Sequence, residues 1–471
     1  MPYISTRDGG APPERLPFEA ALLRGLARDG GLYVPVAWPR LSRGALAALR
    51  GRSYAEIAAT VTYPFLDGVV PEGDWGRMVA AAYRGFAHRA VAPLKQLGAE
   101  TWLMELFHGP TLAFKDYALQ LVGPLLETVL KRRGERATVL VATSGDTGSA
   151  AIEACRDRAA IDIVVLYPNG RISEVQRRQM TTVASANVHT VAIEGTFDDC
   201  QDLVKMMFAD AQFRTALALT GVNSINWARV VAQVIYYVAA AVALGAPERA
   251  VGFAVPTGNF GNVYAAHVAR RMGVPIAEII IGTNRNDILT RFFTTGRMTI
   301  AAVEPSLSPS MDIQVASNFE RLYFELAGRD GGAVAAAFRA FRETGALPAE
   351  PRLWQEAKSL FAAHRVDDDA TRATIAKTYA ATGELVDPHT AVAIAAAEAC
   401  RADPALPLVV LATAHPAKFP EAVESAVGFR PEPPPRLAAV MDRPERVTVL
   451  PNDIVAVERF IAGRVRAQQE A

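Results

Sequence analysis

The chain has 471 residues, of which 49 are basic and 49 are acidic, so its formal net charge is zero. A balanced charge provides no general attraction for nucleic acid or for an anionic membrane, and it excludes functions that depend on a strongly basic surface. The length is sufficient for about two or three domains with substantial cores.

The cysteines and the chain start indicate the compartment. Cys155, Cys200 and Cys400 are odd in number and lack the spacing of a zinc site, and the histidines form no metal-binding pattern. The first residues lack the basic start and apolar run of a signal peptide, and no later segment stays apolar for the length of a membrane span. We therefore expect a cytoplasmic enzyme without a metal ion, whose partner is a small molecule and whose oligomeric state is open.

The predicted elements divide the chain into a helical start and two α/β units. Residues 1–92 carry helical stripes separated by glycine and proline, which predicts an N-terminal helical domain. Short β-branched runs then alternate with helical stretches, which is typical of parallel sheets covered by helices. We expect a small α/β domain at 136–225 and a large one formed by 93–135 and 226–471. Residues 332–382 are rich in alanine and predict a helical insertion or lid.

The stretch from Phe107 to Asp116 contains one lysine, Lys115, among apolar and small residues at the start of a predicted helix. Apolar neighbours such as Leu112 and Phe114 remove water from an ammonium group, which lowers its pKa toward the neutral amine that attacks a carbonyl. A lysine whose charged end reaches solvent is the commoner case. Because later segments supply matching parts of one site, we interpret Lys115 as the catalytic lysine.

The next candidate segment, Thr143-Ser144-Gly145-Asp146-Thr147, directly follows a predicted strand. Hydroxyl groups and free backbone N–H groups at a helix start suit a carboxylate. Simple helix capping explains the same residues equally well when the segment is considered alone. Taken together with Lys115, the segment is expected to bind the carboxylate of a substrate.

Two arginines are candidates for binding a second anion. Asn226 and Arg229 are three positions apart and share a helix face if the segment is helical. The planar guanidinium donates paired hydrogen bonds that suit a phosphate. Arg171, on a predicted turn, is the weaker candidate. The alternative is a solvated arginine beside asparagines that only cap a helix.

A second strand–glycine–helix junction is Gly258-Asn259-Phe260-Gly261-Asn262. Glycines let backbone N–H groups converge at a helix N-terminus, which favours a phosphate. The segment is neither a Walker A loop nor a G-x-G-x-x-G motif, which argues against a nucleotide and favours a monophosphate cofactor. A purely structural turn is the alternative.

Thr413 ends the apolar run 408–412, a predicted strand. A hydroxyl at the carboxyl end of a strand lies at the crevice where α/β sheets bind ligands, so it can meet a ring nitrogen. A threonine at this position is otherwise usually structural.

These segments together resemble threonine synthase, a fold-type II pyridoxal-phosphate enzyme. The resemblance extends from Ser5-Thr6-Arg7 through Ser308-Pro309-Ser310-Met311-Asp312, a stretch without a physical account in the sequence. The runs that carry it are His108–Asp116, Thr143–Gly148, Pro256–Asn262 and Thr413–Lys418.

The resemblance implies a fold and a set of roles. The fold is α/β, with two parallel-sheet domains, a helical N-terminal domain and a helical insertion. The cofactor is pyridoxal 5'-phosphate, bound covalently by Lys115, with its phosphate on the 258–262 loop and its pyridine nitrogen near Thr413. The residues from Ser144 to Thr147 are implied to bind the substrate carboxylate.

The implied reaction converts O-phosphohomoserine and water to threonine and phosphate, by γ-elimination followed by addition of water at Cβ. Lys115 is placed to move protons at Cα and Cβ, and Arg229 with Asn226 to hold the departing phosphate. Two alternatives stay open. One is a phospho-lyase that releases 2-oxobutyrate from the same substrate, and the other is a non-catalytic sensor of the cofactor or of a phosphorylated ligand.

Overall fold

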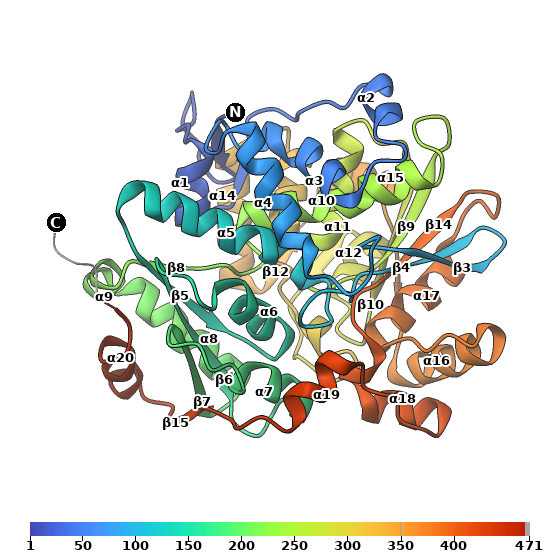
Figure 1. Ribbon diagram of the computed structural model, residues 1–471. Helices are drawn as coiled ribbons and strands as arrows, with labels where there is room; N and C mark the ends of the chain where they lie inside the picture. Colours follow the sequence, from blue (N-terminus) through green and yellow to red (C-terminus); the bar gives the residue numbers. More distant parts are fainter. Residues whose placement is uncertain (349, 467–471) are drawn as a thin grey trace.

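The fold is built on two sheets whose strands are mostly parallel, and the computed structural model describes residues 1–348 and 350–466 (Figure 1). The larger sheet has the order β13-β10-β9-β14-β4-β3, in which only β3 runs antiparallel to its neighbour. Its strands are β3 (Leu94–Gly98), β4 (Thr101–Glu105), β9 (Val251–Pro256), β10 (Ile276–Thr283), β13 (Ala362–Arg365) and β14 (Leu408–Ala412).

The smaller sheet has the order β15-β7-β6-β5-β8 and is parallel throughout. Its strands are β5 (Ala137–Ala142), β6 (Ile161–Pro168), β7 (Val188–Glu194), β8 (Leu219–Thr220) and β15 (Thr448–Pro451). The helices that accompany it are α6 (Asp146–Cys155), α7 (Glu174–Thr181), α8 (Phe197–Ala209), α9 (Ala211–Ala216), α19 (Pro435–Met441) and α20 (Ile454–Ala462).

Apart from β3 and β4, the chain before the smaller sheet is mainly helical and has one further short antiparallel strand pair. It contains β1 (Tyr3–Ser5), α1 (Phe18–Arg24), β2 (Tyr33–Pro35), α2 (Arg43–Ala48), α3 (Tyr54–Thr62), η1 (Tyr63–Phe65), α4 (Glu72–Arg84) and α5 (Lys115–Arg133).

The chain between β8 and α19 contains most strands of the larger sheet and the helices that connect them. Its helices are α10 (Trp227–Ala243), α11 (Gly261–Arg271), α12 (Ile288–Thr295), α13 (Phe319–Leu326), α14 (Gly331–Thr344), α15 (Pro351–Leu360), α16 (Asp368–Thr382), α17 (Pro388–Cys400) and α18 (Pro420–Val427). Two short turns, η2 (Pro309–Met311) and η3 (Pro416–Lys418), and the strand pair β11 (Arg297–Thr299) with β12 (Ala346–Pro348) complete it.

Alternating side chains bury both faces of the larger sheet. Val410 and Ala254 pack with α17, whereas Val409 and Phe253 lie in a common core with α10 and α11. The same alternation divides the smaller sheet, with α8 and α20 covering one face and α5 and α6 the other. Helices α5 and α6 therefore join the two sheets through one core.

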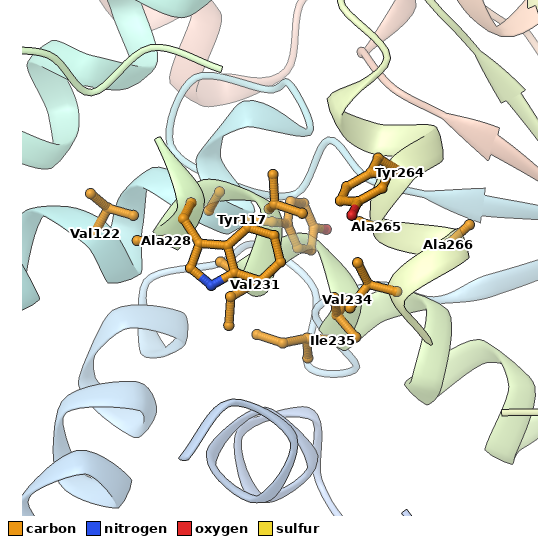
Figure 2. Close-up of a cluster of buried hydrophobic side chains, with 14 of the residues drawn as sticks. Tyr117, Val122, Ala228, Val231, Val234, Ile235, Tyr264, Ala265 and Ala266 are labelled. Carbon is orange, nitrogen blue, oxygen red and sulfur yellow. The ribbon is translucent and has the colours of Figure 1, made fainter. Parts of the chain in front are cut away.

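Helix α10 is the centre of that core, because apolar residues occupy nearly every side of it. Figure 2 shows Val231, Val234 and Ile235 among Tyr117 of α5 and Tyr264 of α11. Tyr3 and Phe18 belong to the same cluster. The expected N-terminal domain at 1–92 thus shares its core with the rest of the molecule, and its boundary stays a prediction.

The structure divides the chain differently from the expectation at two places. β15 pairs with β7 and so joins the smaller sheet, although it lies within 226–471. Residues 332–382 contain β13, which pairs with β10 at the edge of the larger sheet, besides three helices. The sequence Ala-Ala-His-Arg of β13 has no β-branched residue, so the pairing with β10 makes it a strand without help from local propensity.

The carboxyl ends of three central strands lead into the candidate segments. β5 leads to Thr143, β9 to Thr257 and β14 to Thr413. Ligands of open α/β sheets bind at this edge. Over the described ranges, no helix combines the length and the apolar character that a membrane crossing needs.

Candidate active site

Lys115 is the first residue of α5, and its side chain is only 11% exposed. The turn before it, where Leu112 has a φ of 61°, is tied to the end of β14. The N–H of Phe114 donates to the carbonyl of Thr413 at 2.8 Å, and the N–H of His415 donates to the carbonyl of Leu112 at 3.0 Å. These two bonds fix the start of α5 against the carboxyl end of the larger sheet.

The amine of Lys115 lies near a hydroxyl and a carboxylate. It donates to Ser310 Oγ at 3.4 Å and lies 3.8 Å from Asp146 Oδ2. Burial is the main cause that lowers the pKa of Lys115 to about 8; Asp146 opposes it, whereas Lys418 and Arg229 add to it. A substantial fraction of the amine is therefore neutral near physiological pH.

Asp146 is the buried counter-charge of two lysines. Its Oδ1 accepts from Lys418 Nζ at 2.8 Å and from Gln176 Nε2 at 3.0 Å, whereas Oδ2 lies toward Lys115. Although burial favours the protonated form, Lys418 and Lys115 hold the pKa of Asp146 well below its usual range. The side chain of Asp146 is thus anionic and would repel a second carboxylate, so only the backbone of this residue suits the substrate-binding role that we predicted.

The rest of the 143–147 segment is arranged for an anion. Thr143 Oγ1 accepts from the N–H groups of Gly145 and Gly148, each at 2.9 Å, and these bonds fix the conformation of the loop. Gly145 has a φ of 138°, and a Cβ there would lie 2.4 Å from Gln176, so a larger residue does not fit. No hydrogen bond from the hydroxyls of Ser144 or Thr147 to a described residue is present, and both residues are partly exposed.

The 258–262 loop begins α11 and has no acidic residue in the first turn of the helix. A Cβ on Gly258 would lie 2.9 Å from the carbonyl of Ser310, and one on Gly261 would lie 3.2 Å from Asn318 Nδ2. Neither glycine has a positive φ; the left-handed residue is Phe260, with a φ of 63°. A Cβ is therefore opposed by neighbouring backbone at Gly258 and by the Asn318 side chain at Gly261, rather than by the conformation of either residue. The loop presents the N–H groups of a helix start.

The side chains of Phe260 and Asn262 anchor the 258–262 loop to the protein core. Phe260 is 1% exposed and packs against Phe293 and Phe319, so it contributes backbone rather than a side chain to any ligand. Asn262 Oδ1 accepts from the hydroxyls of Tyr236 and Tyr237, the latter at 2.7 Å. Its buried Nδ2 has no hydrogen-bond acceptor among the described residues. The carbonyl of Asn259 accepts from the N–H of Asn318 at 3.1 Å.

Arg229 and Asn226 differ in their availability. Arg229, in the first turn of α10, is 3% exposed, and its Nη1 donates to the carbonyl of Val222 at 3.2 Å. Its buried Nε lacks an acceptor, and no carboxylate within the described ranges forms an ion pair with it. Burial lowers the pKa of Arg229 to about 10, so it stays a cation at neutral pH.

Asn226 is the N-cap of α10, and its side chain is fully engaged. Its Oδ1 accepts from the N–H of Ala228 at 3.1 Å, and its Nδ2 donates to the carbonyls of Leu22 and Gly221. Arg171 is exposed on the turn after β6, where its charge acts on Asp199. The structure thus brings Arg229 toward Lys115, uses Asn226 as a cap, and leaves Arg171 at the surface.

Thr413 follows β14 and is 6% exposed. Its carbonyl accepts from Phe114, but none of the described residues forms a hydrogen bond with its hydroxyl. The hydroxyl stays available for a ligand atom at the sheet edge.

Sequence reasoning missed Ser310 and its supports. The N–H of Ser310 donates to His389 Nε2 at 3.2 Å, and His389 Nδ1 lies 2.8 Å from Asp387 Oδ1. Because Nε2 accepts, the ring proton lies on Nδ1. These contacts join η2 to the start of α17, and a signal for them existed only in the unexplained Ser308–Asp312 stretch.

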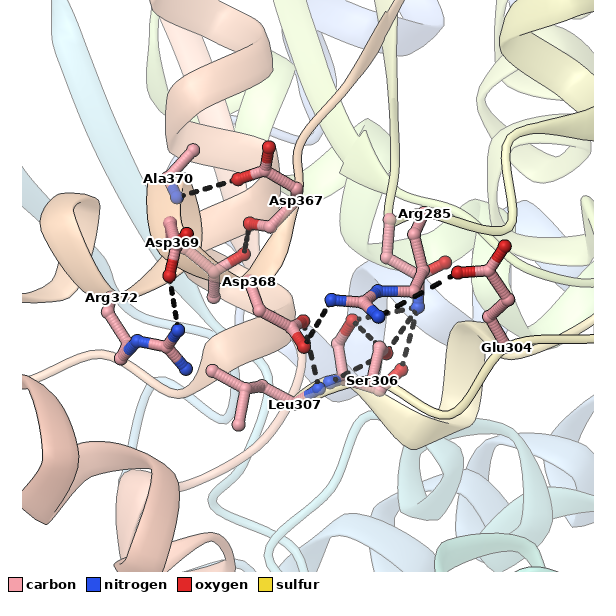
Figure 3. A network of polar contacts seen from close by, with 12 residues as sticks. Arg285, Glu304, Ser306, Leu307, Asp367, Asp368, Asp369, Ala370 and Arg372 are labelled. Atoms are coloured by element: carbon pink, nitrogen blue, oxygen red, sulfur yellow. Dashed lines mark hydrogen bonds and ion pairs between the residues drawn. The ribbon is translucent and has the colours of Figure 1, made fainter.

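The segment before Ser310 is anchored by a polar network (Figure 3). The N–H of Leu307 donates to Asp368 Oδ1 at 3.2 Å, and Arg285 donates to Asp368 Oδ2 at 2.8 Å. Ser306 Oγ donates to Asp312 Oδ1 at 2.6 Å. The start of α16, within the predicted insertion, is therefore an anchor for this segment.

Comparisons with known proteins agree with this arrangement. Residues 86–351 match the family described as pyridoxal-phosphate dependent enzyme, residues 2–83 match the threonine synthase N terminus, and residues 390–461 match the threonine synthase C-terminal family. The chain is 53% identical over 463 residues to the threonine synthase of Pseudomonas aeruginosa, which covers 98% of both chains. The chain belongs to the threonine synthase family.

Solved structures of threonine synthases have the same fold. The pyridoxal-phosphate-bound threonine synthase of Brucella melitensis is 51% identical, with a TM-score of 0.96 over 99% of this chain and 100% of that one. The threonine synthase of yeast is 36% identical, with a TM-score of 0.92 over 98% of each chain. This chain is thus a pyridoxal-phosphate-dependent enzyme of fold type II that acts on a small molecule.

The residues of this threonine synthase site fit the cofactor. The start of α11 leaves backbone donors and the Asn262 amide for a phosphate, in a space that a Cβ on Gly258 would narrow. Lys115 supplies a partly neutral amine, and Thr413 supplies an unengaged hydroxyl.

Proposed function

We propose that the chain converts O-phosphohomoserine and water to threonine and phosphate, with Lys115 as the catalytic lysine. The observation that carries this proposal is Arg229, a buried guanidinium with an unpartnered Nε and no carboxylate partner in the described ranges. A buried cation without a counter-charge is costly unless a ligand supplies one. A phosphorylated substrate supplies that charge.

The two ends of the substrate have separate places in this proposal. The hydroxyls of Ser144 and Thr147, with the N–H groups at the start of α6, bind the carboxylate. Arg229 binds the substrate phosphate and stabilises the charge that develops as the ester bond breaks. Because Asn226 is engaged as a helix cap, we assign the phosphate to Arg229 without it.

Bound pyridoxal phosphate supplies the electron sink that makes protons next to the amino-bearing carbon acidic. The residues of the chain move protons, orient the reacting groups and retain the cofactor. Lys115 moves protons at Cα and Cβ, for which a pKa of about 8 is suitable because both protonation states are populated. Ser310 and Asp146 orient the Lys115 amine, and the loop at 258–262 would hold the cofactor.

Thr413 is proposed to meet the pyridine nitrogen. A hydroxyl is neutral, whereas a carboxylate would stabilise a protonated ring. With Thr413 the ring nitrogen therefore carries less positive charge, and the electron sink is moderated.

The test is the product that forms from O-phosphohomoserine. Phosphate and threonine should appear in equal amounts, and in oxygen-labelled water the label should enter the threonine hydroxyl, because that oxygen is added after phosphate leaves. Homoserine should be a poor substrate because it has no phosphate group for Arg229 to bind. Stoichiometric 2-oxobutyrate would contradict the synthase assignment in favour of the phospho-lyase, and the absence of phosphate release would favour the sensor.

We propose the cytoplasm as the compartment of this activity. Cys155, Cys200 and Cys400 are all free thiols, which a reducing compartment preserves.

A further inference from the structure

Lys418 is a second lysine at the active site, and its role is unexplained by the proposed function. It ends η3, a few residues after Thr413, and its side chain is 0% exposed. Lysine is almost never fully buried unless it is paired. The ammonium donates to Asp146 Oδ1 at 2.8 Å and to the carbonyl of Thr111 at 2.7 Å.

Asp146 is shared unequally between the two lysines. Lys418 lies 2.8 Å from one carboxylate oxygen, and Gln176 Nε2 occupies the same oxygen at 3.0 Å. Lys115 lies 3.8 Å from the other oxygen. Because the attraction between charges falls with distance, the carboxylate stabilises the charge of Lys418 more than that of Lys115.

The geometry also connects three segments. Lys418 joins the turn after β14 to Asp146 at the start of α6 and to Thr111 in the turn before α5. Gln179 Nε2 donates to the same Thr111 carbonyl at 3.0 Å. A change in Lys418 therefore alters both the position of Asp146 and the charge near the Lys115 amine.

We propose that Lys418 is a positioning residue, which engages the Asp146 carboxylate so that a larger fraction of the Lys115 amine is neutral and nucleophilic. The charged groups that act on Lys115 are Asp146 from α6, Lys418 from η3 and Arg229 from α10. Of these, Lys418 acts twice, since its own charge repels a proton on Lys115 and its ion pair occupies the carboxylate that would attract one. This proposal rests on the proposed role of Lys115.

The test measures the protonation of Lys115 in the full chain freed of cofactor, so its outcome is independent of which product the enzyme forms. Acetic anhydride at trace concentration acetylates neutral amines, and mass spectrometry of the Lys115 peptide at a series of pH values gives the pKa. Exposed Lys377, which pairs with Glu398, is the internal reference.

Two substitutions should act in opposite directions. Lys418→Met should raise the pKa of Lys115 by about one unit, so that its acetylation at pH 7 falls about tenfold. Asp146→Asn should lower that pKa and accelerate acetylation. Gln176→Leu removes a neutral donor from the same carboxylate oxygen, and it should change the rate less than about threefold because it leaves every charge in place.

If Lys418 and Asp146 had a purely structural role, both substitutions should shift the pKa of Lys115 in the same direction. A shift in the same direction for Lys418→Met and Asp146→Asn, or an unchanged pKa in Lys418→Met, would overturn the proposal. If Lys418→Met unfolds, as circular dichroism would show, the comparison of Asp146→Asn with the Lys418→Met/Asp146→Asn double variant replaces it. That pair leaves no unpaired carboxylate, and the double variant should have the higher Lys115 pKa.

Discussion

The starts of α6 and α11 have the same local plan but treat charge differently. Each follows a buried parallel strand and presents the N–H groups of a helix start. At α6, Asp146 places a carboxylate in the first turn, and two lysines neutralise it. At α11 the first turn has no acidic residue, and the amide of Asn262 is held by two tyrosine hydroxyls.

This difference indicates what each helix start can bind. Backbone donors alone suit any anion, but a carboxylate in the same turn already satisfies part of the positive potential. A phosphate with about two negative charges is therefore favoured at α11. At α6 the hydroxyls of Ser144 and Thr147 can hold a singly charged carboxylate, while Asp146 serves Lys115 and Lys418.

The largest effect should come from Lys115, which lies between the two helix starts. Lys115→Ala removes the amine that we propose binds the cofactor and moves protons, and we expect turnover to fall by about a thousandfold or more. Borohydride reduction of the wild-type protein should attach the cofactor irreversibly to Lys115, as peptide mapping would show. Cofactor found on Lys418 instead would contradict the assignment, whereas Lys377→Ala should retain full activity.

A substitution that displaces the loop before α11 should weaken the binding of the cofactor. In Gly258→Val the new Cβ would lie 2.9 Å from the Ser310 carbonyl and 3.2 Å from Met311 Cα, so the loop and η2 must move apart. The loss of one charge-assisted hydrogen bond to the cofactor phosphate costs about 1.5 to 3 kcal/mol. We therefore expect cofactor affinity, measured by absorbance titration, to fall roughly tenfold to a hundredfold. Gly76→Ala is the control, because a Cβ there meets nothing within 4 Å. Unchanged affinity in Gly258→Val would place the cofactor phosphate elsewhere.

Arg229 tests whether a third anion position exists apart from the two helix starts. Arg229→Met keeps the apolar stem and removes the charge, and the loss of one charge-assisted contact costs about 1.5 to 3 kcal/mol. We expect the KM for O-phosphohomoserine to rise roughly tenfold to a hundredfold, with cofactor affinity unchanged.

Asn226→Ala is the matched control for Arg229→Met. It removes the cap of α10, so it should lower the free energy of unfolding by about 1 kcal/mol without a comparable rise in KM. A similar rise in KM for both variants would return Asn226 to the phosphate site. If Arg229→Met leaves KM unchanged, Arg171 becomes the candidate.

The smallest predicted effect is on pH dependence. Because burial lowers the pKa of Lys115 to about 8, about a tenth of the amine is neutral at pH 7, and the neutral fraction rises with pH. The rate at which added pyridoxal phosphate attaches to the cofactor-free chain should increase about tenfold between pH 7 and 9 and then level off. A rate that continues to rise to pH 10 would indicate an ordinary lysine and contradict the burial argument.

Much of the two sheets, and the segments that meet at their carboxyl edge, could be predicted from the sequence. Strand β14 has the predicted bounds, because a strand buried on both faces appears as an uninterrupted apolar run. Parallel strands bring their carboxyl ends to one edge, so segments as distant as those at Lys115 and Thr413 meet.

The remainder depends on contacts that no local pattern encodes. Ser310 lies 195 residues from Lys115, and the ion pair of Lys418 with Asp146 joins η3 to α6, two segments far apart in the sequence. The sequence around Asn226 is compatible with a helix cap and with a phosphate ligand. Only the hydrogen bonds of its amide to the carbonyls of Leu22 and Gly221 show that the side chain is engaged within the protein. β13 becomes a strand through β10 alone.

Because Arg229 has no ion-pair partner among the described residues, phosphate binding should affect both the turnover and the thermal stability of the protein. Without a ligand, the folded chain bears the cost of a buried cation that no described carboxylate compensates. Any phosphate that binds there stabilises the folded state by mass action, and that includes the phosphate which the reaction releases. High phosphate should therefore slow the enzyme as a competing product and, at the same time, raise its melting temperature.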